Sequence, residues 1–102
     1  MARNGGAVPS NGAGVEDLLR IIRRRIEHAK VYPDTARREG LQGTAEIRFR
    51  IEPDGSVATV EVVRSSGHAL LDDVSAETVR RAAPFPLLPG WIRIPLAYRL
   101  DQ

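Results

Sequence analysis

The residues best suited to chemistry lie in one short stretch that contains two serines, a histidine and two aspartates: Ser65, Ser66, His68, Asp72 and Asp73. A catalytic serine needs a base within hydrogen-bond reach, and a third group must hold that base in place. Closeness in sequence does not supply this geometry, because the stretch joins a predicted strand to a predicted helix. The two adjacent aspartates diverge by about 100° on a helix. We therefore predict that the chain is not an enzyme.

Metal and cofactor binding are poorly supported by the remaining side chains. His28 and His68 are the two histidines, they lie far apart in the sequence, and no clear third ligand accompanies them. A zinc site ordinarily needs three or four protein ligands. The chain has no cysteine, which excludes disulfides, thiol catalysis and cysteine-ligated zinc. We expect neither a metal nor another cofactor.

The basic residues do not form a convincing nucleic-acid site. Lysine and arginine together number 15 against 13 acidic residues, so the formal net charge is only +2. On a helix Arg23, Arg24 and Arg25 would fan over about 200° and form no single patch. The run 40–43 (GLQG) matches the GxxG loop of KH domains, but that loop joins two helices, whereas this run leads into a predicted strand. We predict no nucleic-acid partner.

Length and composition fit one small soluble domain of 102 residues. Residues 1–14, rich in Gly, Ala, Asn and Ser, have little to bury and are expected to be a flexible linker remnant or an artificial tail. Residues 15–102 are expected to form the domain. No apolar run approaches the roughly 20 residues that cross a bilayer, so the chain as given is expected to be soluble.

The elements that would position these residues begin with a helix over Val15–Lys30. Its apolar residues recur at spacings of three and four, which places them on one face: Val15, Leu19, Ile22, Ile26 and Ala29. Pro33 ends this helix, because the residue before a proline is driven out of the α region. Asp34–Glu39 can add one helical turn, closed by Gly40.

A β-hairpin is predicted next, with strands at Thr44–Glu52 and Val57–Arg64. Apolar residues alternate in both strands, as in half-buried strands. The loop 53–56 (PDGS) has four residues and suits a turn. An even loop brings the two apolar sets to one face through the pairs Ile47–Val62, Phe49–Val60 and Ile51–Ala58.

A second long helix is predicted over Leu71–Ala83, followed by a proline-rich crossover and a last strand over Trp91–Leu100. The inward residues of the helix are expected to be Leu71, Val74, Thr78 and Ala82. The order α-β-β-α-β predicts an α+β fold, a two-layer sandwich in which two helices cover one face of a three-stranded antiparallel sheet.

Pro95 interrupts the last predicted strand and points to a function. Proline has no N–H to donate to a sheet ladder, so within sheets it occurs on edge strands. An open edge can accept an extended peptide as an additional strand. The alternative is that Pro95, Arg93 and Arg99 only protect the edge from aggregation.

An ordered series of motifs resembles the C-terminal domain family of TonB proteins. The matching residues are Tyr32-Pro33 with Ala36, Gly40 and Gly43, the hairpin Ile51–Val57, the run Val62–Gly67, Leu71-Asp72, Phe85-Pro86 and the closing Ile94–Leu100. The series extends from Tyr32 to Leu100. No single motif is diagnostic, but their order makes a chance match improbable.

The resemblance implies a periplasmic, non-catalytic binding domain of an energy transducer in Gram-negative bacteria. In this family the domain captures the TonB box of an outer-membrane transporter by strand addition and acts on its plug, which admits siderophores, vitamin B12 or similar ligands. Inner-membrane proton-channel partners act through an N-terminal anchor that this sequence lacks. The resemblance places the binding edge at Ile92, Arg93, Ile94, Leu96, Ala97, Tyr98, Arg99 and Leu100, with Arg93, Tyr98 and Arg99 as candidates for selecting the partner.

Two further possibilities accompany this interpretation. Related folds occur in TolA-type envelope proteins and in sensory appendages, which would share the edge strand without the transport role. Exposed edges would also allow two copies to exchange strands as a homodimer. His28–Val31 departs from the family pattern before Tyr-Pro, so the resemblance gives this stretch no role in receptor contact.

Overall fold

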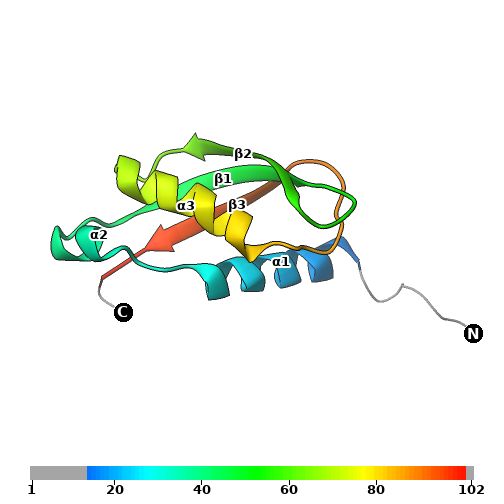
Figure 1. Ribbon diagram of the computed structural model, residues 1–102, viewed down its shortest axis with the longest axis horizontal. Coiled ribbons are helices and arrows are strands. Elements are labelled where there is room, and N and C mark those ends of the chain that lie inside the picture. The colour runs from blue at the N-terminus through cyan, green and yellow to red at the C-terminus, as the bar shows by residue number, and fades with distance from the viewer. Residues whose placement is uncertain (1–13, 101–102) are drawn as a thin grey trace, which may run out of the picture.

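The computed structural model describes residues 14–100 and forms two layers, with helices against one antiparallel sheet (Figure 1). In chain order the elements are α1 (Val15–Ala29), α2 (Asp34–Arg38), β1 (Gly43–Ile51), β2 (Val57–Arg64), α3 (Ala69–Ala82) and β3 (Ile92–Tyr98). The predicted α+β class is confirmed, and α2 is the short turn expected before the hairpin. The linker expected at 1–14 lies outside the described residues except for Gly14.

The sheet has the strand order β2-β1-β3, so the first strand of the hairpin is central. Both of its neighbours are antiparallel to it. Helix α3 packs across β1 and β2, and α1 packs against α3. In Figure 1, α1 runs beneath β3 in the view, so the two helices cover different parts of the sheet. This placement leaves β2 and β3 as the two outer strands.

The hairpin register agrees with the prediction at two pairs and differs at the third. Ile47 lies opposite Val62 and Phe49 opposite Val60, as expected. Ile51, however, lies opposite Val57, because the register shifts between Arg50 and Ile51. Ala58 is therefore the extra residue of a β-bulge. The pair Ile51–Val57 encloses a loop of five residues, an odd number. The extra residue Ala58 compensates for this, so Phe49 and Val60 still lie opposite each other as a four-residue loop would have placed them.

The apolar face of β2 is less buried than expected. Val60 packs partly against the core, whereas Ala58 is exposed and Val62 is 40% exposed. The bulge explains Ala58, because an unpaired residue leaves the regular alternation of the strand. Val62 belongs to an outer strand, and within residues 14–100 one flank of that strand has no neighbouring strand to cover it.

The core lies between the sheet and the two long helices. Strand β1 contributes Ala45, Ile47, Phe49 and Ile51, as its alternation predicted. Strand β3 contributes Ile92, Ile94, Leu96 and Tyr98, while α1 contributes Ile22 and Ile26 at 0% exposure. Helix α3 buries Leu71, Ser75, Thr78, Val79 and Ala82, and leaves Val74 half-buried. Burying an aliphatic side chain stabilises a fold by about 1.5–3 kcal/mol before entropy is counted, so this shared core holds α1 against the domain.

The ends of the elements differ from the prediction by one or two residues. Helix α3 begins at Ala69 and ends at Ala82, and β3 ends at Tyr98 rather than Leu100. The backbone N–H of Leu100 instead donates to Gln42 Oε1 at 2.8 Å, which fixes the chain just after the strand. Across residues 14–100, no helix combines the length and the apolar character that a membrane span requires.

Candidate functional site

The outer edge of β3 offers unpaired backbone groups. Within residues 14–100, β3 pairs with β1 along one side and with no strand along the other, which confirms that Pro95 marks an edge strand. Lys30 Nζ donates to the Ala97 carbonyl at 2.6 Å, so this carbonyl points to the outer side. Peptide groups of alternate residues point to the same side of a strand. The carbonyls of Arg93 and Pro95 and the N–H groups of Arg93 and Ala97 therefore also face outward.

The structure divides the predicted edge residues into two sets. The side chains of Ile92, Ile94, Leu96 and Tyr98 face the helices and are at most 3% exposed. Arg93 and Arg99 are exposed, whereas Ala97 and Leu100 are half-buried. Arg99 and Leu100 come after the end of β3 at Tyr98. Tyr98 was expected to help select the partner, but its side chain is only 1% exposed and faces the core instead. Its burial follows from the alternation of β3.

Helix α1 supplies a second wall beside this edge, which sequence reasoning left unassigned. Lys30, just after α1, bonds the Ala97 carbonyl, forms an ion pair with Glu27 at 3.1 Å and lies 5.5 Å from the centre of the Tyr98 ring. Its side chain is only 24% exposed. The i,i+3 spacing of Glu27 and Lys30 could have revealed the ion pair. No local pattern connects residue 30 to residue 97.

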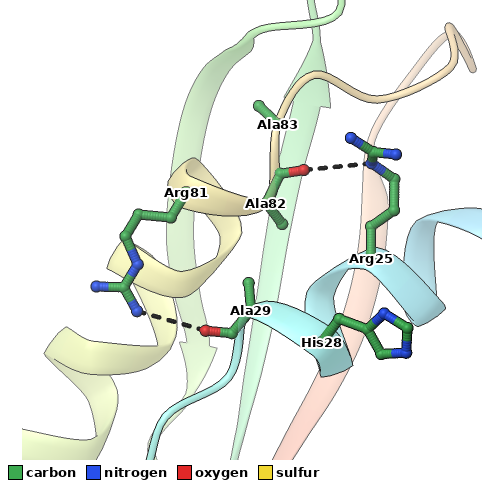
Figure 2. A pocket seen from close by; sticks show the side chains of 6 residues that line it. All are labelled: Arg25, His28, Ala29, Arg81, Ala82 and Ala83. Atoms are coloured by element: carbon green, nitrogen blue, oxygen red, sulfur yellow. Dashed lines mark hydrogen bonds between the residues drawn. The ribbon is translucent and has the colours of Figure 1, made fainter.

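A separate cationic hollow of about 310 Å³ lies where the ends of α1 and α3 meet, and Figure 2 shows its lining. Arg25 of α1 donates to the Ala82 carbonyl at 3.3 Å, and Arg81 of α3 approaches the Ala29 carbonyl at 3.5 Å. The last carbonyls of a helix lack partners within it and carry partial negative charge. An arginine of each helix therefore donates to a carbonyl at the C-terminal end of the other helix, and these contacts hold the two helices together. His28 lines the same hollow.

A structural network around the start of α3 joins Asp72 to Ser65 and Ser66. Asp72 accepts hydrogen bonds from Ser65 Oγ at 2.5 Å, Ser66 Oγ at 2.7 Å and Ser66 N–H at 2.8 Å. The backbone N–H of His68 donates to Ser66 Oγ at 3.2 Å. Burial raises the pKa of Asp72, but these hydrogen bonds and the charge of His68 outweigh it, so the pKa lies below its ordinary 3.8.

This arrangement does not build a nucleophile. Both serine hydroxyls donate to a carboxylate that is already ionised at neutral pH, and His68 joins the network through its backbone. A triad requires the imidazole between the hydroxyl and the carboxylate. The network instead closes the turn between β2 and α3. In the described part of the chain, no three His, Asp or Glu side chains converge on a possible metal position.

Fold and edge together define a class: a small α+β domain that presents an open strand edge with a helix beside it. Residues 28–100 match the family of Gram-negative bacterial TonB protein C-terminal domains. The chain belongs to this family and is a domain of the TonB energy-transducer type.

Individual relatives agree with this assignment. The chain is 37% identical to Protein TonB of Pseudomonas putida over 87 residues, which cover 78% of this chain and 36% of that protein. It is 32% identical to Protein TonB of Helicobacter pylori (strain ATCC 700392 / 26695) over 89 residues, which cover 84% of this chain and 31% of that protein. The sequence therefore corresponds to about a third of the length of these relatives.

Solved structures show the same architecture. A solution structure of the Helicobacter pylori TonB C-terminal domain superposes with a TM-score of 0.78 at 30% identity, covering 96% of this chain and 98% of that one. TolAIII bound to a peptide derived from the N-terminus of TolB gives a TM-score of 0.68 at 22% identity, covering 92% of this chain and 86% of that one. The second likeness concerns the fold alone.

Proposed function

We propose that this domain captures the TonB box of an outer-membrane transporter by adding it as a strand to the outer edge of β3. The observation that carries the proposal is the row of outward backbone groups at Arg93, Pro95 and Ala97, which has no strand partner within residues 14–100. Main-chain hydrogen bonds tolerate many sequences, so one such edge can serve several receptors.

Membership in the TonB family supplies the cellular setting of the proposal. The domain would act in the periplasm, as part of a longer protein anchored in the inner membrane and driven there by proton-channel partners. Force on the captured segment would remodel the transporter plug and admit siderophores, vitamin B12 or similar ligands. Several ladder hydrogen bonds would share this force if the captured strand is pulled along its own axis.

An amide-shift titration tests the proposal. The ¹⁵N-labelled domain is titrated with peptides from the N-terminal segments of outer-membrane transporters in the same genome, and each peptide has a proline-substituted control. Shifts concentrated between Ile92 and Leu100, and absent with the control peptides, are expected. Because proline removes a backbone donor without removing most side chains, loss of binding with it separates strand addition from simple side-chain docking.

A variant of the protein provides the matching control. Ala97→Pro removes one outward N–H and leaves the inward ladder to β1 intact, because Ala97 directs its peptide groups away from β1. We expect weaker peptide binding with the remaining amide spectrum unchanged. If no peptide shifts the β3 amides at millimolar concentration, the transport role fails, and a TolA-like envelope or appendage role, or strand exchange between two copies, takes its place.

A further inference from the structure

Helix α1 and strand β3 run side by side in the same direction. Near their starts, Leu19 and Ile92 line one hollow; further along, Arg23 and Ile94 line a second; at their ends Lys30 reaches the edge of β3. Fifteen helical residues at about 1.5 Å each and seven strand residues at about 3.3 Å each both span about 22–23 Å. The helix therefore follows the open edge over its whole length.

The hollow at the start of β3 suits an apolar side chain. It has a volume of about 290 Å³, and its apolar walls come from Val15, Leu19, Leu88 and Pro89, while Arg23 and Arg93 also line it. Val15 is 59% exposed, so this apolar surface is open to a partner. Covering it would release water from apolar surface, which favours binding in proportion to the area covered. Trp91, the only tryptophan of the chain, lies at its rim.

The second hollow suits an acidic side chain. It has a volume of about 430 Å³ and is lined by Arg23, Glu27, Ile94 and Pro95. Glu27 is already paired with Lys30, whereas Arg23 has no ion-pair partner among residues 14–100. The hollow therefore presents one uncompensated positive charge. A guanidinium binds carboxylates well because its planar N–H donors match their geometry.

The spacing of the two hollows matches the repeat of a strand. Residues directly opposite each other in paired strands project to the same face. Residues of an added strand that lie opposite Ile92 and Ile94 would therefore both point toward α1, two positions apart, as alternate side chains of a strand do. Each would enter one hollow, and Arg23 lies between the two because it lines both.

We infer that the α1–β3 groove selects its partner by these two side chains: an apolar one held against Val15 and Leu19, and an acidic one, two residues away, held by Arg23. This inference rests on the proposed strand addition and adds a rule for which extended segments bind. The carboxylate neutralises Arg23, and the apolar group fills the neighbouring hollow.

Two nine-residue peptides of identical composition test the rule. Both have threonine ends; one has the core Leu-Thr-Glu-Thr-Leu and the other the core Thr-Leu-Glu-Leu-Thr. The first places Glu and Leu two residues apart in either chain direction, so the result does not depend on strand orientation. The second places them on opposite faces. Trp91 fluorescence gives the dissociation constants, and β3 amide shifts show where each peptide binds.

We expect the first peptide to bind about fivefold more tightly, the scale of one exposed charge pair together with a modest apolar contact. Arg23→Glu should remove this difference, while the matched control Arg24→Glu, on the neighbouring exposed arginine, should retain it. Val15→Asp should weaken the first peptide by placing a charge in the apolar hollow. All three positions, Val15, Arg23 and Arg24, are exposed, so these variants should fold.

The outcomes separate this inference from the proposed function. Equal affinity of the two peptides with clear β3 shifts would overturn the two-hollow rule and leave strand addition standing. An unchanged difference in Arg23→Glu would overturn the assignment of the acidic position. Absence of β3 shifts with these peptides and with every transporter peptide would overturn both.

Discussion

Lys30 Nζ lies 2.6 Å from the carbonyl oxygen of Ala97 and thereby joins the end of α1 to the outer edge of β3. Lysine beside an exposed strand is a common protection against unwanted edge-to-edge pairing. Here the ammonium also occupies one of the outward acceptors that an added strand would use. A partner that pairs along the whole of β3 must therefore displace this contact.

Replacing Lys30 tests this competition. Lys30→Met keeps most of the stem but removes the donor, so the Ala97 carbonyl becomes available to an incoming N–H. A hydrogen bond of this kind is worth about 1 kcal/mol net, so a peptide that binds β3 should bind about fivefold more tightly. Titration against Arg24→Met measures the effect. Equal affinities in the two variants would mean that Lys30 does not compete with the added strand.

Tyr98 carries the buried side-chain oxygen that lacks a hydrogen-bond partner among residues 14–100. Its ring meets Tyr32 edge to face, with centroids 5.5 Å apart, and the Tyr32 hydroxyl donates to the Leu41 carbonyl. Because a buried hydroxyl without a partner costs free energy, Tyr98→Phe should raise the free energy of unfolding by about 1 kcal/mol. Tyr32→Phe should lower it by about the same amount. Urea denaturation of both variants checks the signs, and a loss in Tyr98→Phe would contradict the assignment.

Gly43 is required for space, because an added Cβ would lie 2.3 Å from the Ser66 carbonyl oxygen. The oxygen belongs to the backbone of the turn after β2, and the Cβ would be bonded directly to the backbone of β1, so neither atom moves without disturbing the sheet. Gly43→Ala should cost about 2–3 kcal/mol of folding stability.

Gly40 is the matched comparison for this position. It has a φ of +71° with nothing within 4 Å of an added Cβ, so Gly40→Ala should cost only the backbone strain of about 1 kcal/mol. Thermal denaturation of both variants measures the difference. A smaller loss in Gly43→Ala than in Gly40→Ala would show that the turn after β2 yields easily.

Asp72 should make folding sensitive to acid. Its pKa in the folded domain lies below the ordinary 3.8, so the folded state favours the carboxylate. The resulting stability is fully present above the unfolded-state pKa near 3.8 and is lost as pH falls through the lower folded-state value. The urea concentration at the unfolding midpoint, measured from pH 6 down to pH 2, should therefore decrease across that acidic range.

Asp72→Asn isolates this contribution. The variant should lose about 1 kcal/mol near neutral pH, because its neutral amide accepts weaker hydrogen bonds from Ser65 and Ser66. The difference from the natural chain should shrink as pH falls below about 4, where the aspartate of the unfolded chain becomes neutral, and should go on shrinking through the lower folded-state pKa. A difference that stays constant down to pH 2 would contradict a role for the charge.

Much of the fold followed from local patterns. The alternation in β1 and β3 identified their buried faces, because successive side chains of a strand point to opposite sides. Pro95 identified β3 as an edge strand, because its missing N–H excludes a central position. The hairpin pairs Ile47–Val62 and Phe49–Val60 followed from the same alternation. The bulge at Ala58 did not, since the parity of a loop does not show whether a strand contains an extra residue.

The sequence by itself thus determined the class of fold, the family and the strand whose edge is open. The tertiary structure alone decided what stands beside that edge: Lys30 at the Ala97 carbonyl, and two hollows between α1 and β3. Periodicity records which face of an element is apolar, because it reflects interactions between residues close in the chain. The meeting of residue 30 with residue 97 depends instead on how the crossover returns β3 to the sheet and on how Ile22 and Ile26 anchor α1 in the shared core.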